Sequence, residues 1–371
     1  MGDGGKVRFA IVGCGRIGAR HAAHVAANPR AELAAVCDVV PARARAFAAE
    51  YGGTPCAALA EALALSVDVV SICTPSGLHA AMAAAALDAG AHVLCEKPMA
   101  LNLADCDRVV AAEARSGRRF FLVKQNRYNA PMRALKDAVW NRRLGRLALI
   151  AADVLWNRGR AYYAADAWKG TMAEDGGALM TQCSHFLDLM VWIGGPVAAV
   201  SARMANLDHP YIETEDTGVV SLRFASGALG ALAYTTCTYP RTYEGSITVL
   251  GSAGTVRVGG EYLNALERWD VRGAPRPEGA DEAPLLPGAD GGYKGSTSRH
   301  GDVIENVIAV LRDGEEIKTN SAQGRESIAV MQAAYLSALA GGREVPLPLT
   351  GADAAFKLDE QPPLGGRRKS V

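Results

Sequence analysis

A glycine-rich turn between an apolar strand and a helix constrains the fold more than any other feature of this sequence. The apolar run 7–12 stops at Val12-Gly13-Cys14-Gly15-Arg16-Ile17-Gly18, which contains the pattern G-x-G-x-x-G, and the spacing predicts a helix over 17–27. The next predicted strand, 32–37, ends at Asp38, about 20 residues after the last glycine. This order is typical of the first βαβ unit of a dinucleotide-binding domain.

Each residue type in the turn suits the binding of a pyrophosphate. Gly13 permits the tight turn, Gly15 leaves room for the ligand, and Gly18 lets the helix pack closely on the strand. Arg16 and Ile17 begin the predicted helix, where unpaired N–H groups and the positive end of the helix dipole face the phosphates. We therefore expect all five residues to contact the cofactor.

The acidic residue at the end of the second strand selects between the two nicotinamide cofactors. Asp38 can accept hydrogen bonds from the hydroxyls of the adenosine ribose, and it would repel a 2′-phosphate. The sequence therefore predicts NAD. Arg43 lies nearby and leaves NADP as the alternative.

Short apolar runs and Ala-rich helical patterns continue to alternate through the first 125 residues. Such continuous apolar strands, separated by helices, favour a parallel sheet that is covered on both faces. We predict a doubly wound α/β Rossmann domain over 1–125, with strands at 67–73, 92–95 and 120–123 and helices at 42–51, 79–89 and 103–116.

The pattern changes after residue 125, where longer strands alternate apolar and polar residues. They lie at 147–156, 197–204, 218–224, 229–238 and 246–250, with one helix predicted at 177–193 and two more at 302–311 and 321–339. This favours an α+β domain with a large open, mostly antiparallel sheet over 126–360, which would bind substrate and form the oligomer interface. A Pro-, Gly- and Asp-rich surface loop is predicted at 273–295, and a disordered basic tail at 361–371.

Composition excludes several classes of function. The chain has 39 Lys and Arg against 39 Asp and Glu, so neither nucleic acid nor an acidic surface is an expected partner. We find no apolar run of about 18 residues and no signal peptide. The eight cysteines lack C-x-x-C spacing, which predicts free thiols in a cytoplasmic protein and no metal site. Small molecules and further copies of the chain are the expected partners.

Two more motifs follow predicted strands of the first domain. Thr74-Pro75-Ser76-Gly77-Leu78-His79 comes after the third strand, at the sheet edge where ligands bind in open α/β folds, although an ordinary turn would also explain it. Cys95-Glu96-Lys97-Pro98 ends the next strand. A lysine beside a positively charged nicotinamide has a lowered pKa and can donate to a developing alkoxide. Taken alone, this tetrapeptide would more often be a surface lysine before a turn.

In combination these motifs resemble the Gfo/Idh/MocA oxidoreductase family. The Gly-rich turn, T-P-x-x-x-H at 74–79 and E-K-P at 96–98 occur in order, and the resemblance continues in W-K-G-T at 168–171, D-G-G-A at 175–178 and S-H-F-L-D at 184–188. The segments 123–129, 219–230 and 238–260 are similar to the UDP-N-acetylglucosaminuronate 3-dehydrogenases. That subgroup oxidises the C3 hydroxyl of a nucleotide sugar, upstream of an aminotransferase.

The resemblance implies roles for particular residues. His185 would take the hydroxyl proton as hydride leaves for NAD, and Lys97 would stabilise the oxyanion, although the two could exchange these roles. Asp188 would either orient His185 or bind another helix. Besides the Gly-rich turn and Asp38, the expected cofactor contacts are Thr74, Pro75, His79, Glu96, Lys97, Gln125 and Trp168. The expected substrate contacts are Lys97, Asn126, Arg127, Tyr128, Lys169, Thr181, Gln182, His185 and Tyr239.

One departure from the family pattern keeps other substrates open. Many members have Asp, or Asn in the subgroup, four residues before the histidine, where this chain has Thr181. The alternatives are a free sugar, an aminosugar or an inositol oxidised by the same chemistry, and a non-catalytic NAD-sensing regulator. The resemblance also allows 2-oxoglutarate as a second substrate, and a homodimer or homotetramer.

Overall fold

The computed structural model describes residues 5–260, 262–281 and 299–364. Contacts between residues divide the chain into two compact units. The first unit takes in residues up to Gln125 together with Arg299–Ile328, and the second takes in the remaining described residues.

The first unit is built on a six-stranded parallel sheet in the order β3-β2-β1-β4-β5-β6. The central strands consist mainly of apolar residues, and all of their residues except Arg8 are buried, because helices cover both faces. The strand order reverses between β1 and β4, which confirms the doubly wound Rossmann fold. The strands are β1 Val7–Val12, β2 Ala31–Cys37, β3 Thr54–Cys56, β4 Val69–Ile72, β5 His92–Cys95 and β6 Phe120–Leu122.

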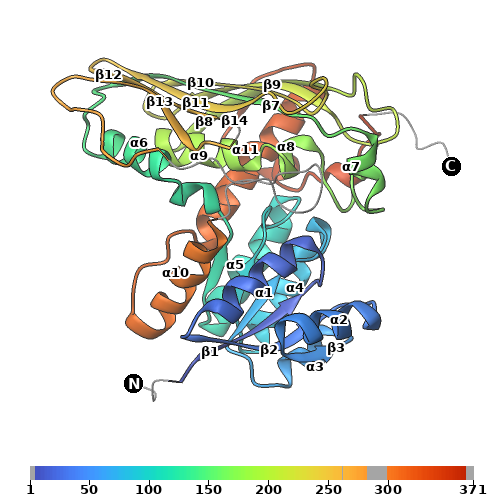
Figure 1. Cartoon of the computed structure of the whole chain (residues 1–371). Helices are drawn as coiled ribbons and strands as arrows, with labels where there is room; N and C mark the ends of the chain where they lie inside the picture. Colours follow the sequence, from blue (N-terminus) through green and yellow to red (C-terminus); the bar gives the residue numbers. More distant parts are fainter. Residues whose placement is uncertain (1–4, 261, 282–298, 365–371) are drawn as a thin grey trace. The chain divides into compact units, whose positions relative to one another are not determined.

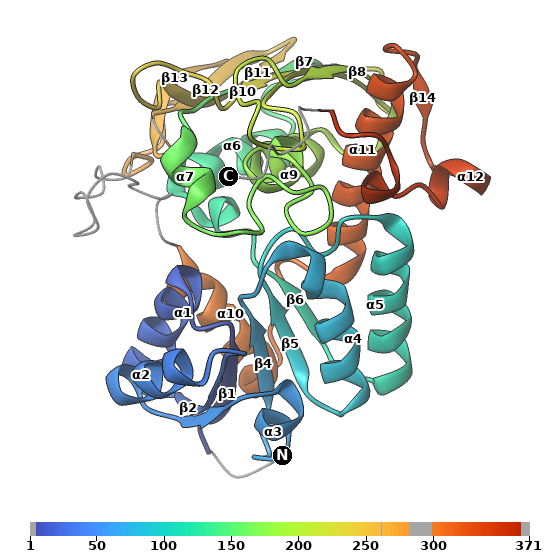
Figure 2. The ribbon, with the colours of Figure 1, turned by 90° about the vertical axis from the view of Figure 1, so that its right-hand side faces the viewer.

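Helices lie on the two faces of this sheet. In Figure 2, α1 and α10 lie on one face, and α4 and α5 lie on the other. Asn102 caps α5 by accepting a hydrogen bond from the Asp105 N–H, and Gly117 ends the same helix in the left-handed region. The helices of this unit are α1 Arg16–Ala27, α2 Pro41–Tyr51, α3 Leu59–Leu63, α4 His79–Asp88, α5 Leu103–Ser116 and α10 His300–Asp313, with a 3₁₀ turn η1 at Ser76–Leu78.

The second unit contains an eight-stranded sheet in the order β13-β12-β11-β7-β10-β9-β8-β14. Neighbouring strands are antiparallel except β7 and β10, which confirms the predicted open, mostly antiparallel sheet. Along β9 the residues alternate between buried and exposed, with Val220 and Leu222 inside and Val219 outside. The strands are β7 Leu147–Leu155, β8 Val197–Ala205, β9 Thr217–Phe224, β10 Leu229–Thr235, β11 Glu244–Gly251, β12 Gly254–Gly259, β13 Ala265–Val271 and β14 Val345–Pro346.

The helices of the second unit include one correction to the sequence analysis. The single helix predicted over 177–193 is wrong: two helices, α8 Ala178–Thr181 and α9 Ser184–Gly194, meet at a break at Gln182 and Cys183. Figure 1 shows α9 and α6 against one face of the sheet. The other elements of this unit are α6 Ala130–Trp140, α7 Arg160–Ala164, α12 Gly351–Ala354 and η3 Leu358–Glu360, and two elements, η2 Gln125–Tyr128 and α11 Ser321–Leu339, begin in the first unit and end in the second.

Residues 299–328 differ from the sequence-based domain division, which assigned them to the second domain. They pack in the first unit because the apolar face of α10, with Val303 and Val307 buried, lies against α1. The N–H of Leu122 on β6 also donates to the Thr319 carbonyl. The remainder of the predicted loop, 282–295, and the end of the tail, 365–371, lie outside the described residues.

Two expectations about the whole chain concern cysteines and membranes. All eight cysteines are free thiols, as the sequence predicted. Among the described residues, every helix is too short or too polar to cross a bilayer.

Candidate functional site

The three glycines of the first turn face different surroundings. Gly13 has a φ of +100°, and a Cβ there would lie 2.6 Å from the Cys73 carbonyl oxygen. A Cβ on Gly18 would lie 2.0 Å from the Gly13 carbonyl oxygen, so both positions require glycine for packing. A Cβ on Gly15 would meet no atom within 4 Å. The space beside Gly15 fits a bound pyrophosphate, which needs close approach to the backbone.

Asp38 is bonded to the glycine-rich turn. Its Oδ2 accepts a hydrogen bond from the Cys14 N–H at 3.0 Å, and its Oδ1 accepts one from the Val40 N–H at 2.8 Å. The carboxylate is therefore held at the carboxyl edge of β1 and β2, beside the start of α1. Gly15 is the N-cap of α1 and provides no side-chain hydrogen bond, so the first turn of the helix retains donors for an anion.

His79 joins the turn at 74–79 to the E-K-P segment. Its Nδ1 lies 2.7 Å from the Pro98 carbonyl oxygen, and its Nε2 lies 2.9 Å from the Thr74 carbonyl oxygen. Burial lowers the pKa of this imidazole. The structure thus gives His79 a positioning role between two motifs of the predicted site, while its contact with the cofactor stays a prediction, as do those of Thr74 and Pro75.

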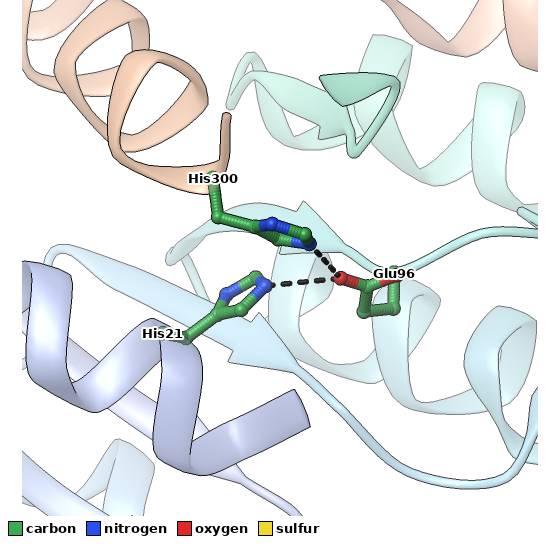
Figure 3. Close-up of side chains that lie close together, drawn as sticks. All are labelled: His21, Glu96 and His300. Atoms are coloured by element: carbon green, nitrogen blue, oxygen red, sulfur yellow. Dashed lines mark hydrogen bonds and ion pairs between the residues drawn. The ribbon is translucent and has the colours of Figure 1, made fainter. Parts of the chain in front are cut away.

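Glu96 lies at the centre of a buried polar cluster, shown in Figure 3. Its Oε1 is 3.0 Å from His21 Nε2 and 3.3 Å from His300 Nε2. Its Oε2 accepts a hydrogen bond from the backbone N–H of Lys97 at 3.2 Å. The sequence analysis missed this cluster because His21 and His300 lie 75 residues before and over 200 residues after Glu96, and only the fold brings them together.

Arg127 and Asp188 form a buried ion pair in the second unit. The guanidinium donates from Nε to Asp188 Oδ2 at 2.8 Å and from a terminal nitrogen to Oδ1 at 2.9 Å, and it lies 5.3 Å from the Trp192 ring centre. Asp188 thus binds another element, since this pair joins α9 to η2, and the orientation of His185 by Asp188 stays a prediction. Contact of Arg127 with substrate stays a prediction.

Two further cationic side chains, Arg158 and Lys169, lie near the ring of Tyr162. Arg158 is buried, donates from Nε to the Gln182 amide oxygen at 2.9 Å, and lies 5.5 Å from the Tyr162 ring centre. The Gln182 amide donates to the Tyr162 hydroxyl at 2.8 Å. Lys169 Nζ lies 4.5 Å from the same ring centre and 2.7 Å from Asp166 Oδ2. The sequence-predicted residues Lys169 and Gln182 therefore share one cluster, to which Arg158 also belongs.

The remaining predicted contacts differ in burial. His185, the second residue of α9, is buried, and the Thr181 hydroxyl donates to the Gly177 carbonyl at 2.9 Å. Asn126 is 4% exposed, and its Oδ1 has no hydrogen-bond partner among the described residues. Tyr239 is 95% exposed. Gln125 is buried, Tyr128 and Trp168 are half-buried, and the ligand contacts of all these residues stay predictions.

Sequence analysis also missed a buried acid that supports α8. Glu215 Oε1 accepts hydrogen bonds from the Leu179 N–H at 2.8 Å, the Tyr335 hydroxyl at 2.8 Å and the Tyr234 hydroxyl at 3.2 Å. Burial raises the pKa of this carboxyl to about 7, against the opposing effect of those hydrogen bonds. No pattern in the sequence distinguishes Glu215 from the acidic residues around it.

Comparison with known proteins accounts for both units. Residues 7–124 match the oxidoreductase family Gfo/Idh/MocA, described as an NAD-binding Rossmann fold, and residues 132–257 match the C-terminal domain of the same family. The chain belongs to the Gfo/Idh/MocA family. It is accordingly an oxidoreductase with an NAD-binding Rossmann domain, as the Gly-rich turn and the E-K-P segment predicted.

Solved structures in this family resemble the chain over nearly its full length. The WlbA dehydrogenase from Bordetella pertussis, in complex with NADH and UDP-GlcNAcA, is 40% identical, with a TM-score of 0.84 over 93% of this chain and 100% of that one. WlbA from Chromobacterium violaceum, with the same ligands, is also 40% identical, with a TM-score of 0.86 over 95% of this chain and 98% of that one. An inositol 2-dehydrogenase from Rhizobium meliloti is 27% identical over 89% of this chain and 96% of its own length.

Proposed function

We propose that this protein is an NAD-dependent dehydrogenase that oxidises the C3 hydroxyl of a UDP-N-acetylglucosaminuronate-like nucleotide sugar to a ketone. The observation that carries the proposal is the 40% identity, over at least 93% of the chain, to two WlbA dehydrogenases crystallised with NADH and UDP-GlcNAcA. The ketone would then be the substrate of an aminotransferase, because a carbonyl at C3 is what such an enzyme converts to an amine.

The chain supplies two groups for the reaction. When bound, NAD accepts the hydride that leaves C3. His185 takes the hydroxyl proton, which suits an imidazole because its ordinary pKa lies near neutrality. Lys97 donates a hydrogen bond to the oxygen as negative charge develops on it. One hydride and one proton leave the alcohol, so the product is two hydrogens lighter than the substrate.

The cofactor contacts that we propose are those of the Rossmann unit, together with Gln125 and Trp168. The open space beside Gly15 and the tethered Asp38 carboxylate support a pyrophosphate at the start of α1 and a ribose beside β2. Arg16 and Ile17 begin α1 and would supply backbone N–H groups to the phosphates.

The substrate contacts that we propose lie in the second unit, apart from Lys97. Asn126 supports this assignment because its buried Oδ1 has no partner among the described residues and is available to a sugar hydroxyl. Arg158 and Lys169, both close to Tyr162, would face the carboxylate or diphosphate of the substrate. Arg127, Tyr128, Thr181, Gln182 and Tyr239 complete the proposed set.

A second candidate function keeps the fold and the chemistry but changes the substrate to an inositol or a free sugar. The match to an inositol 2-dehydrogenase over 96% of that protein favours it, and so does Thr181, which cannot carry the negative charge of an aspartate. A non-catalytic NAD-sensing role is less well supported, because Lys97 and His185 are both present.

Three further properties belong to the proposal. We propose a cytoplasmic homodimer or homotetramer, with an exposed sheet face that includes Val219 on β9 and Leu229 on β10 as part of the contact. We also propose that 2-oxoglutarate serves as a second substrate that reoxidises bound NADH. The domain division follows the two units, with residues 299–328 assigned to the Rossmann domain.

The direct test is incubation of the protein with UDP-N-acetylglucosaminuronate, NAD and 2-oxoglutarate, followed by mass spectrometry of the nucleotide sugar. We expect a product two hydrogens lighter. Lys97→Met and His185→Asn should each lower kcat by about 10²–10³-fold while NADH still binds. Oxidation of myo-inositol without any oxidation of the nucleotide sugar would establish the second candidate, and NADH binding without turnover of any sugar would favour the regulator.

A further inference from the structure

Three buried side chains from distant parts of the first unit converge on one oxygen atom. His21 lies on the buried face of α1, Glu96 follows β5, and His300 is the first residue of α10 (Figure 3). Their exposed fractions are 1%, 6% and 2%. Both imidazoles point an Nε2 at Glu96 Oε1, at 3.0 and 3.3 Å, which are hydrogen-bonding distances.

The two imidazoles have opposite protonation preferences. Burial opposes a charge on His21, but interactions with Cys73 and Glu96 outweigh it and raise the pKa to about 10. Burial lowers the pKa of His300 to about 4, with Glu96 opposing the shift and His21 and Arg20 adding to it. A buried carboxylate with one charged and one neutral imidazole carries no net charge, which is the stable way to bury such a group.

The hydrogen bonds assign a hydrogen to each nitrogen that faces the cluster. His21 donates from Nε2 to Glu96, because a carboxylate oxygen only accepts, and its Nδ1 is hydrogen-bonded to the Ser71 hydroxyl at 2.8 Å. Neutral His300 donates from Nε2 to the same Glu96 oxygen. The other carboxylate oxygen accepts from the Lys97 N–H at 3.2 Å. Glu96 thus accepts three hydrogen bonds, and the third holds the backbone of Lys97.

The same three side chains are a possible set of metal ligands, since their ligand atoms lie within 4.8 Å of one another. Two features favour a hydrogen-bonded network. Both nitrogens are directed at one oxygen that can only accept, so each Nε2 carries a hydrogen, and a protonated ring nitrogen has no lone pair with which to bind a cation. A divalent metal would have to displace the proton of His21 and separate each nitrogen from that oxygen.

We propose that His21, Glu96 and His300 form a metal-free network of positioning residues that holds the backbone of Lys97 in register with α1 and α10. This inference rests on the catalytic role of Lys97 in the proposed function. Because α1 begins at the Gly-rich turn, the network links the element that would bind the pyrophosphate to the residue that would contact the reacting oxygen. A displacement of about 1 Å at such a residue is enough to lower kcat substantially.

The network predicts different outcomes for matched substitutions. His300→Leu removes a neutral donor and should lower kcat roughly tenfold, with the Kd for NADH changed by less than about twofold. His300→Gln retains a neutral amide donor and should restore most of kcat. His21→Gln replaces a charged donor with a neutral one and should lower kcat, unlike the same substitution at His300. Thermal unfolding of each variant checks that it is folded.

Two measurements do not depend on the substrate. In ¹⁵N-histidine NMR of the full chain at pH 8, His21 should be an imidazolium and His300 neutral, and Glu96→Gln should convert His21 to the neutral form. In the NADH-bound protein, acylation of Lys97 relative to Lys6, quantified by peptide mass spectrometry, should change several-fold in His300→Leu and little in His300→Gln. These results would stand even if UDP-N-acetylglucosaminuronate were not the substrate.

Three results would overturn the proposal. The first is a folded His300→Leu variant in which both kcat and the acylation of Lys97 equal those of the wild type. The second is a neutral His21 at pH 8. The third is one equivalent of zinc bound per chain, lost on His300→Leu and required for activity, which would identify a metal site.

Discussion

Among the described residues, each unit buries one glutamate, and the two carboxyls differ in their partners and in their pKa. Glu96 in the first unit accepts hydrogen bonds from two imidazoles and the Lys97 N–H. Burial raises its pKa, but the bonds from His21 and His300 outweigh that and hold the pKa well below its ordinary value. The donors to Glu215 that the structure describes are the Leu179 N–H and the hydroxyls of Tyr234 and Tyr335, all neutral, and burial raises the pKa of Glu215 to about 7.

The difference shows that burial alone does not determine the charge of a carboxyl group. A partner that carries positive charge, such as His21, compensates for the hydration that the buried carboxylate loses. Neutral hydroxyl and amide donors compensate for that loss only in part. Glu215 also uses one oxygen for three hydrogen bonds, while its Oε2 has no partner among the described residues. The first unit therefore holds a carboxylate paired with an imidazole, and the second holds a carboxyl whose pKa burial raises to about 7, bonded to the N–H of Leu179 in α8.

The largest effect on stability is expected from Glu96→Gln. Removing one partner of a buried ion pair leaves His21 without its counter-charge, so the free energy of unfolding should fall by about 3 kcal/mol near pH 6. The pKa of Glu96 is lowered and that of His21 is raised by folding, so their contribution is lost as the pH falls toward strong acid and as it rises toward about 10. Urea unfolding of both proteins at pH 6 and pH 10 measures this.

If Glu96→Gln and the wild type had equal free energies of unfolding at pH 6, the ion pair between Glu96 and His21 would be contradicted. A matched control is Glu32→Gln, because Glu32 pairs with Arg8 on the surface, where both side chains are well exposed. That substitution should change the free energy of unfolding by less than about 1 kcal/mol.

The next largest effect is expected from Gly177→Ala in the second unit. Gly177 has a φ of +102°, and a Cβ there would lie 2.4 Å from Glu215 Oε2 and 2.5 Å from the Tyr335 hydroxyl. Backbone strain and overpacking together should lower the free energy of unfolding by about 2–3 kcal/mol. Because α8 precedes the break before His185, kcat should fall as well. A variant with wild-type stability would show that α8 is not held against Glu215.

A smaller effect, opposite in its dependence on pH, is expected from Glu215→Gln. The folded-state pKa of about 7 lies above the ordinary value, so this carboxyl contributes stability at low pH that is lost as the pH rises to 7. The amide does not titrate. The free energy of unfolding of Glu215→Gln, measured relative to that of the wild type, should therefore rise by roughly 2 kcal/mol between pH 5.5 and pH 8. A difference that is constant over this range would mean that Glu215 stays charged.

The smallest effect on stability is expected from Gly15→Ala in the first unit. Gly15 has an ordinary φ of −92°, and a Cβ there would meet no atom within 4 Å, so the melting temperature should change little. The added methyl group would occupy the space proposed for the pyrophosphate, and the affinity for NADH should fall at least about tenfold. Titration calorimetry with NADH measures this, and unchanged affinity would mean that the phosphates bind elsewhere.

The two units also differ in how much of each could be predicted from the sequence. In the first unit the pattern itself is local: Gly13, Gly15 and Gly18 lie on one short turn and Asp38 follows the next strand, although the carbonyl that excludes a side chain at Gly13 belongs to the distant Cys73. A short window of sequence contains all of these signals, so the Rossmann fold and the position of the Gly-rich turn were predictable.

The features that were missed depend on contacts between distant segments. The break between α8 and α9 falls in the run T-Q-C-S-H at 181–185, which contains neither glycine nor proline, and the helical periodicity on either side predicts one continuous helix. His300 and Glu215 acquire their roles from partners far away in sequence. Residues 299–328 return to the first unit because the apolar face of α10 finds its partner in α1, and no local pattern indicates that.

The most direct test of the account follows the hydride itself. UDP-N-acetylglucosaminuronate deuterated at C3 would be incubated with the protein and NAD for a single turnover. The protein would then be denatured, and the masses of the released cofactor and sugar would be measured by mass spectrometry. The account predicts reduced cofactor that carries one deuterium and a keto-sugar that has lost it, both formed about 10²–10³-fold more slowly with Lys97→Met. Reduced cofactor without deuterium, or no reduction while myo-inositol is oxidised, would contradict it.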